Sequence, residues 1–306
     1  MNIRTWTITS AAVAALMLVA MPAQAKKAPA ARLLDPANPA DQFEISKRIQ
    51  CGAADGTPAV YHFGGKVYSR VAGEPDRLLF LADGMNVRQC VAVNDPKRGK
   101  GYRLVSREVL FYLDPATGKV LRDWKNPWTG ETVPVMHVHN DPVNSRPNFP
   151  IGADGKPASV NLKREGKFLF MPLEAPLFYT NPLAGEYQEY VGGNYHAMEI
   201  FNFFMDADDM LNTANATAHP GVSWQRISYW LPWMKMRSRD GGMVFTAMGS
   251  KLRSYDELPA VIKDEIALNY PIYTTPPAGD DTRPNETTWT VFKKQVDAAK
   301  AAAAGK

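Results

Sequence analysis

Two histidines two residues apart, His137 and His139, have the types and spacing most suited to chemistry in this 306-residue sequence. Side chains alternate across a β-strand, so both rings would point to one face. That face could supply two metal ligands, or a general base and its orienting partner. His196 is the candidate third ligand, with Glu199 and Asp141 behind it. Asp141 would orient a histidine ring nitrogen, or only form the turn that follows the strand. The competing interpretation is a core histidine hydrogen-bonded to backbone, because the spacing is less specific than H-E-x-x-H.

A second polar pattern lies in the predicted strand at residues 187–205. Its even positions are uncharged and mix polar with apolar groups: Gln188, Tyr190, Gly192, Asn194, His196, Met198, Ile200, Asn202 and Phe204. Such a mixture is expected in the wall of a ligand cavity. The odd positions carry Tyr195 and Glu199. A bulge at Gly192-Gly193 would exchange the faces, so either His196 or Glu199 points inward. An aromatic face packed under a helix is the alternative.

The predicted strand at residues 222–234 places Arg226 between Trp224 and Trp230 on one face. An arginine there can pair with a carboxylate or phenolate while the indoles stack on an aromatic ring. The competing interpretation is a surface arginine in cation–π contact with tryptophan. Arg88 raises the same question on an earlier strand. The predicted substrate-binding residues are Arg226, Trp224, Trp230, Asn194, Tyr190 and Arg88.

The elements that position these residues are mostly strands. Runs rich in β-branched and aromatic residues alternate with Gly, Asn-Pro and Asp-Pro signals. They predict strands at residues 59–71, 77–93, 101–113, 119–125, 131–139, 167–173, 187–205, 222–234 and 242–253, and helices at 40–50, 206–214, 254–269 and 287–303. We expect a mainly β fold, a single antiparallel barrel or strongly curved sheet of calycin type with a few peripheral helices. Closure would remove exposed edges and leave room for a small molecule.

A repeated turn orders part of this sheet. Residues 114–119, D-P-A-T-G-K, recur as N-P-W-T-G-E at 126–131. In each, Asp or Asn caps a type I turn, Pro presets φ, and Gly takes the left-handed position. The strands at 101–113, 119–125 and 131–139 should therefore form a meander.

The N-terminus has the features of an export signal. Arg4, an apolar run at residues 11–20 and the small residues at 23–25 predict a signal peptide at residues 1–25. A flexible lead-in is expected at 26–39 and a single barrel-like domain with C-terminal helices at 40–306. The run is too short to span a membrane, so no stable anchor is expected after cleavage and the protein should be periplasmic or secreted.

Charge and cysteine content limit the partners. The formal net charge is +4, with basic and acidic residues interspersed, so nucleic acid is not an expected partner. Cys51 and Cys90 can form a disulfide in an oxidising compartment, or remain two buried apolar residues. A small-molecule ligand or substrate is the expected partner.

The residues W-x-N-P-x-T-G-E at 124–131, continuing into H-V-H-N-D-P-V-N at 137–144, resemble the pattern of a family known as domain of unknown function 1838. The resemblance would cover most of the mature chain. It implies a single domain, and nothing about catalysis.

Three functions remain open. No nucleophile elbow, phosphate loop or dinucleotide fingerprint is present, which disfavours covalent-serine and nucleotide chemistry. The leading hypothesis is an exported, cofactor-independent lyase or isomerase acting on a small, partly apolar, aromatic molecule. Its base would be His137 or His139, its acid His196 or Tyr195, and its anion-binding group Arg226. The alternatives are a non-catalytic periplasmic carrier of an apolar ligand, and a hydrolase whose divalent metal binds His137, His139 and His196.

Overall fold

The computed structural model describes residues 31–184, 186, 189 and 192–305. The predicted signal peptide and Tyr190 lie outside the described residues. Residues from Arg32 onward form a compact unit. In the described part of the chain, no helix combines the length and the apolar character needed to cross a membrane.

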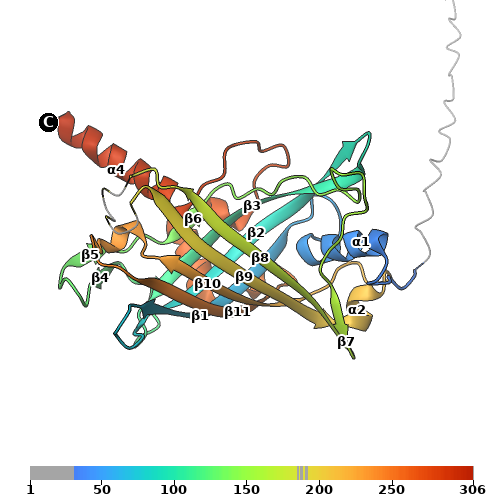
Figure 1. Ribbon diagram of the computed structural model, residues 1–306, viewed down its shortest axis with the longest axis horizontal. Helices are drawn as coiled ribbons and strands as arrows, with labels where there is room; N and C mark the ends of the chain where they lie inside the picture. Colours follow the sequence, from blue (N-terminus) through green and yellow to red (C-terminus); the bar gives the residue numbers. More distant parts are fainter. Residues whose placement is uncertain (1–30, 185, 187–188, 190–191, 306) are drawn as a thin grey trace, which may run out of the picture. The chain divides into compact units, whose positions relative to one another are not determined.

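Nine strands form one antiparallel sheet (Figure 1). In order across the sheet they are β6 (Val138–Asn140), β3 (Gly99–Leu113), β2 (Leu78–Asp95), β1 (Ala59–Arg70), β11 (Gly242–Lys251), β10 (Gly221–Tyr229), β9 (Asn194–Asp206), β8 (Phe168–Thr180) and β7 (Lys163–Glu165). The prediction of a mainly β, antiparallel fold is confirmed. The sheet is open, because β6 and β7 form its two edges without pairing to each other in the described ladder.

The sheet is strongly curved. Side chains of β3 and β9 line one cavity, although β2, β1, β11 and β10 lie between these strands in the sheet. The face that carries them is therefore concave. Alternation along each strand assigns Tyr61, Glu108 and Trp224 to this concave face and their sequence neighbours to the convex face.

Added elements cover parts of both faces. The helices are α1 (Pro39–Gln50), α2 (Ala207–Leu211), α3 (Ala260–Asn269) and α4 (Thr288–Ala304), with short 3-10 turns η1 (Pro232–Met234), η2 (Tyr255–Glu257) and η3 (Pro271–Thr274). On the convex side, Ile262 and Ile266 of α3 pack with Met85 and Phe111. On the concave side, Ile45 and Ile49 of α1 pack with α2 at one end. Figure 1 shows these two helices beside each other, at the end of the sheet where β7 lies.

The repeated turns form as predicted, but the meander forms only in part. Gly118 and Gly130 have φ of 67° and 74°, and Asp114 and Asn126 accept hydrogen bonds from the turn backbone. The end of β3 meets the following segment only at the Leu113–Val120 bridge, and β4 (Asp123–Lys125) and β5 (Thr132–Pro134) then pair with each other, outside the nine-stranded sheet.

The hairpin leaves the main sheet because its apolar side chains fill the other concave end. Trp124 packs against Phe80 and Trp233, with ring centroids 5.5 and 6.0 Å apart. Val133 is fully buried in the same cluster. The burial of these side chains outweighs continued strand pairing with β3.

A disulfide joins α1 to β2. Cys51 directly follows α1 and bonds to Cys90, with their Cα atoms 5.5 Å apart. Part of the predicted lead-in is also packed: Leu34 is buried, and its N–H donates to the Leu211 carbonyl. These contacts hold α1 against the concave face.

Removing the disulfide should destabilise the fold. It closes a loop of 39 residues, for which the chain-entropy relation gives about 4 kcal/mol. The variant Cys51→Ser/Cys90→Ser should lower the free energy of unfolding by up to that amount, measured by denaturant titration. A reductant should lower the free energy of unfolding of the wild-type protein and leave that of the variant unchanged. Equal stability of oxidised wild type and variant would contradict this expectation.

Candidate functional site

The middle of the concave face is open between the two filled ends. A cavity of about 610 Å³ lies there, within the size range of small-molecule sites. Strands β1, β2, β3, β8, β9 and β10 contribute to its wall, and residues 285–289, before and at the start of α4, complete the lining. Its apolar lining includes Phe63, Phe201, Trp224 and Trp289. A recess of about 70 Å³ reaches Glu108, Glu199 and Arg226.

An ion pair forms one side of the recess. Arg226 on β10 lies directly opposite Glu199 on β9, and its Nη1 donates to Glu199 Oε1 over 2.7 Å. Its Nη2 donates to the hydroxyl oxygen of Tyr195 over 3.1 Å. Burial alone would lower the pKa of Arg226, but Tyr195 and Glu199 raise it well above its ordinary value. Arg226 is thus a permanent cation whose charge Glu199 offsets.

Glu108 on β3 faces this pair across the cavity. Asn140 Nδ2 donates to Glu108 Oε1 over 2.8 Å. Burial raises the pKa of the Glu108 carboxyl, the charge of Glu199 raises it further, and the bond from Asn140 partly offsets both. Two carboxyl groups of one cavity therefore differ, since Glu199 is paired with an arginine and Glu108 favours its proton.

Several buried polar atoms at the cavity wall have no hydrogen-bond partner among the described residues. They are Trp224 Nε1, Trp289 Nε1 and Asn140 Oδ1. A buried donor or acceptor left unpaired costs free energy, so such atoms point to a ligand or ordered water. Their presence at one cavity supports a polar ligand group there.

The cavity opens at the gap between β3 and β8, which lie toward opposite edges of the sheet. A second hollow of about 640 Å³ shares Leu104, Ser145 and Leu173 with it. These residues come from β3, the segment after β6, and β8. A closed barrel would seal this gap, so the open sheet provides a mouth.

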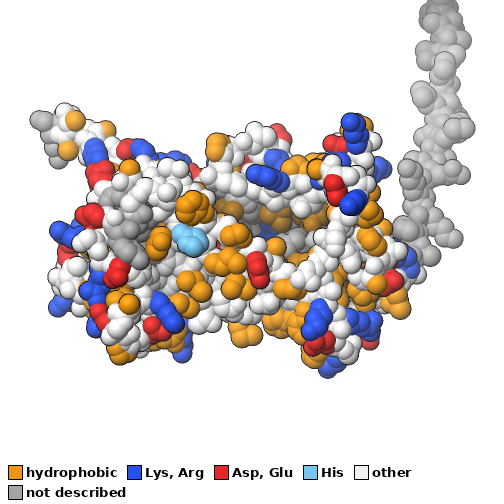
Figure 2. All heavy atoms as spheres, in the orientation of Figure 1, with side chains coloured by type: hydrophobic (Ala, Val, Ile, Leu, Met, Phe, Trp, Pro, Cys, Tyr) orange, Lys and Arg blue, Asp and Glu red, His pale blue; other side chains and the backbone are white. Residues whose placement is uncertain are grey.

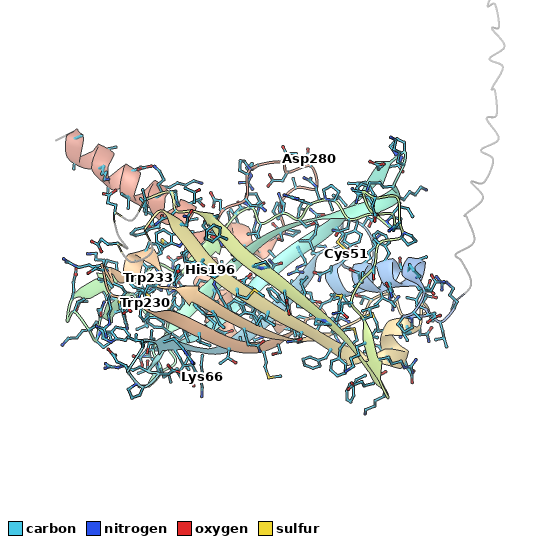
Figure 3. All side chains as sticks on the ribbon, in the orientation of Figure 1. Cys51, Lys66, His196, Trp230, Trp233 and Asp280 are labelled. Atoms are coloured by element: carbon cyan, nitrogen blue, oxygen red, sulfur yellow. A yellow bond between two sulfur atoms is a disulfide. The ribbon has the colours of Figure 1, made fainter. Side chains whose placement is uncertain are left out.

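The structure brings five of the predicted site residues together. Tyr195, Glu199, Trp224, Arg226 and Arg88 all line the cavity. On β9 the odd-numbered side chains face the cavity. Of the two alternatives left open by the sequence, Glu199 therefore points inward and His196 does not. Asn194 is exposed at the start of this strand. Trp230, which precedes η1, is buried in the core and not in the cavity wall. Its ring lies 5.2 Å from that of Trp128, and Figure 3 shows it beside Trp233.

None of the three candidate histidines lines the cavity, and His196 lies apart from His137 and His139, whose Nδ1 is 2.8 Å from the His137 carbonyl oxygen. His196 is exposed on the convex face, where Figures 2 and 3 show it among hydrophobic side chains. His139 lies on the convex side, with its ring tilted against that of Tyr270 and the centroids 5.3 Å apart. His137 is buried, and its Nδ1 accepts a hydrogen bond from the Tyr112 N–H over 3.1 Å. Burial lowers the pKa of His137 to about 4, which fits a neutral core histidine.

Asp141 is engaged by arginines instead of a histidine. Its Oδ1 accepts from Arg107 Nε over 3.0 Å and from Arg283 Nη2 over 3.1 Å. Over the described ranges, no three His, Cys, Asp or Glu side chains are grouped closely enough to hold a metal ion. The predicted set of His137, His139 and His196 is thus not assembled.

Glu108 is the main site residue that sequence reasoning missed. Its signal is a lone carboxylate on one face of β3, among Tyr102, Leu104, Ser106, Leu110 and Tyr112. A charged residue on such a face is rarely buried without a reason. Arg103 and Arg107 occupy the opposite face of β3, where Arg103 donates to the carbonyls of Gly279 and Asp281.

The raised pKa of Glu108 predicts a pH-dependent stability. The folded protein holds this proton more tightly than the unfolded chain, so the stability is complete below the ordinary pKa of 4.5 and falls as pH rises through the raised value. Glu108→Gln should remove this loss, raising the free energy of unfolding by about 1–2 kcal/mol at high pH and changing little at acidic pH. Denaturant titrations across this range measure it. A variant less stable than wild type at high pH would contradict the assignment.

The comparisons with known proteins agree with the sequence resemblance. The family model described as "Protein of unknown function (DUF1838)" matches residues 56–296, which include every strand of the cavity wall. A search of the curated proteins finds no match. Since the model matches more than half of the sequence, the chain belongs to the DUF1838 family.

Proposed function

We propose that this protein is an exported enzyme, a lyase or isomerase, that moves a proton within a small, partly apolar molecule held in the concave cavity. No cofactor takes part in the proposed reaction. The observation that carries the proposal is the pair of carboxyl groups with opposite environments, Glu108 and Glu199. Acid–base enzymes use this device to keep one group ionised and the other ready to exchange a proton near neutral pH.

Glu108 is the proposed proton carrier. As carboxylate it removes a proton from a substrate carbon, so that the C–H bond breaks and an O–H bond forms on Glu108. The electron pair moves onto a substrate oxygen, giving an enolate-like anion. Glu108 then returns the proton to a second carbon in an isomerisation. In an elimination, the electron pair of the enolate forms a C=C double bond, the bond to the departing group breaks with its own electron pair leaving on that group, and Glu108 protonates that group.

Tyr195 is the proposed donor to the developing oxyanion. Its oxygen accepts from Arg226 Nη2, which leaves the hydroxyl hydrogen free of that bond. An O–H polarised by a guanidinium and placed in a buried site stabilises negative charge that forms during the reaction. Arg226 and Glu199 hold this donor in place. The sequence assigned His196 or Tyr195 as the acid and His137 or His139 as the base. In this proposal Tyr195 donates a hydrogen bond, and Glu108 takes the place of the histidines as base.

The cavity wall favours an aromatic substrate. The ring of Trp224 lies 5.4 Å from Phe63 and 6.5 Å from Phe201, and these rings line the cavity together. Tyr179 and Trp289 close it near Tyr195, at 5.2 and 5.4 Å from that ring. Aromatic surfaces of this kind bind flat apolar rings. We further propose that the curved sheet acts as calycin barrels do, by enclosing a ligand on its concave face.

Export to the periplasm or the medium is part of the proposal. It is supported by the leader-like residues 1–25 and by the Cys51–Cys90 disulfide. Disulfides persist in oxidising compartments.

A carrier of an apolar ligand is the second candidate. It is favoured by the observation that Arg226, Glu199 and Tyr195 satisfy one another without a ligand. In that case the polar groups would only orient the bound molecule. Binding without chemical change distinguishes this function from catalysis.

Deuterium exchange across a panel of candidate compounds tests the proposal. Wild-type protein is incubated in D₂O with small aromatic enols, ketones and unsaturated compounds that raise its melting temperature. Mass spectrometry should show deuterium uptake or conversion for at least one compound. Glu108→Gln should bind that compound within about threefold of wild type but lower exchange by about 10²-fold or more.

The matched control is Glu165→Gln, the same substitution on the exposed strand β7. It should exchange at the wild-type rate. Ligands that stabilise wild type with neither exchange nor conversion would replace the enzyme by the carrier. Equal exchange by Glu108→Gln would remove Glu108 as the proton carrier.

A further inference from the structure

We infer that the ligand carries a carboxylate that binds Arg88, while its apolar body extends along the cavity toward Trp224. This inference rests on the proposed function only in taking the concave cavity as the ligand site. It adds the chemical class of the ligand, an aromatic carboxylic acid, and the direction in which it lies.

Arg88 is a cation of the cavity wall with only neutral partners. Its Nε donates to Asn86 Oδ1 and its Nη1 to Gln50 Oε1, each over 2.6 Å. Its guanidinium lies over the Tyr61 ring, 4.7 Å from the centroid. No carboxylate in the described part of the chain forms an ion pair with it, and its Nη2 has no described acceptor. The side chain is thus held rigidly with one N–H group available to the cavity.

Two further buried cations lie near Arg88, both paired with backbone carbonyls. Lys251 Nζ donates to the carbonyls of Arg48 and Cys51 at the end of α1. Arg48 donates to the carbonyls of Asn215 and Asn212 over 2.9 and 3.1 Å. Burial lowers the pKa of Lys251 to about 7, and the charges of Arg88 and Arg48 contribute to that shift. Of these three cations, Arg88 is the one that lines the cavity.

Arg226, the other arginine that lines the cavity, is neutralised by Glu199. An anionic group of the ligand is therefore most favourable beside Arg88. The anion-binding role that sequence assigned to Arg226 passes to Arg88, on geometric grounds.

The register places the anion site close to the proposed proton carrier. Glu108 lies opposite Asn86, and Arg88 follows two residues later on the same face. Such diagonal neighbours have Cα atoms about 7–8 Å apart. A carboxylate on Arg88 would bring a carbon only a few bonds away within reach of Glu108. The ring of Trp224, which lines the same cavity, then lies against the apolar body of the ligand.

Matched acids and amides test the inference. The probes are 3-phenylpropanoate, 4-phenylbutanoate and cinnamate, each with its primary amide, measured by titration calorimetry at low salt. Wild type should bind the best acid at least about tenfold more tightly than its amide, the range of a hydrogen bond to a charged group. Arg88→Gln should reduce that ratio to less than about twofold.

A second variant guards against failure of Arg88→Gln to fold. Gln50→Glu keeps Arg88 but supplies an internal carboxylate to its Nη1, so it should also abolish the preference for acids. Arg103→Gln is the matched control, because Arg103 lies on the convex face of β3 and binds backbone carbonyls. It should retain the wild-type ratio.

The outcomes separate this inference from the proposed function. Equal binding of acid and amide by wild type, no binding of any acid, or an acid preference kept by both Arg88→Gln and Gln50→Glu would overturn the inference. Arg88-dependent binding of acids without deuterium exchange would support it while removing the enzyme proposal. Deuterium exchange of neutral compounds that Arg88→Gln does not affect would support the enzyme proposal and remove the inference of a carboxylate ligand.

Discussion

The curvature of the nine-stranded sheet is the constraint on which the site depends. A curved sheet of this size must fill its concave face, and this protein fills only the two ends. Helices α1 and α2 occupy one end, and the β4–β5 hairpin with η1 occupies the other. Strands from both halves of the sheet line the space between these ends. Glu108 on β3 and Glu199 on β9 therefore face one recess, although four strands lie between β3 and β9 in the sheet. Without the curvature these carboxyl groups would not interact.

Burial then determines what each charged group can do. Removing an ion from water is costly unless a partner or several hydrogen bonds compensate. Arg226 and Glu199 form an ion pair in which each compensates the burial of the other. Glu108 has only a neutral amide partner and therefore favours its proton, while Arg88 cannot lose its proton and keeps an unmatched charge. The three cases arise from one dielectric environment and differ only in the partner that each group has.

The sequence predicts the elements better than their arrangement. Alternating apolar residues located β1, β2 and β3 within a few residues, because a two-residue period is local. The β4–β5 hairpin shows the limit: its turn chemistry is local and correct, but its removal from the sheet depends on distant Phe80 and Trp233. The face of β9 could not be fixed from sequence either, since it depends on where the strand begins after the Gly192-Gly193 pair. A shift of one residue exchanges Glu199 for His196.

The histidines show why residue type is weaker evidence than the face on which a residue lies. His137 and His139 have the composition of a catalytic pair, yet the chain between β5 and β6 breaks the strand geometry that would align them. One ring is buried against Phe111 and the other lies against Tyr270. By contrast, Glu108 and Arg88 look like ordinary charges in the sequence. Their position on the concave face of adjacent strands, two residues apart in register, leaves both facing the cavity with neutral partners. Chemistry is expected where burial leaves a charge without its counterpart, because only a ligand can then supply it.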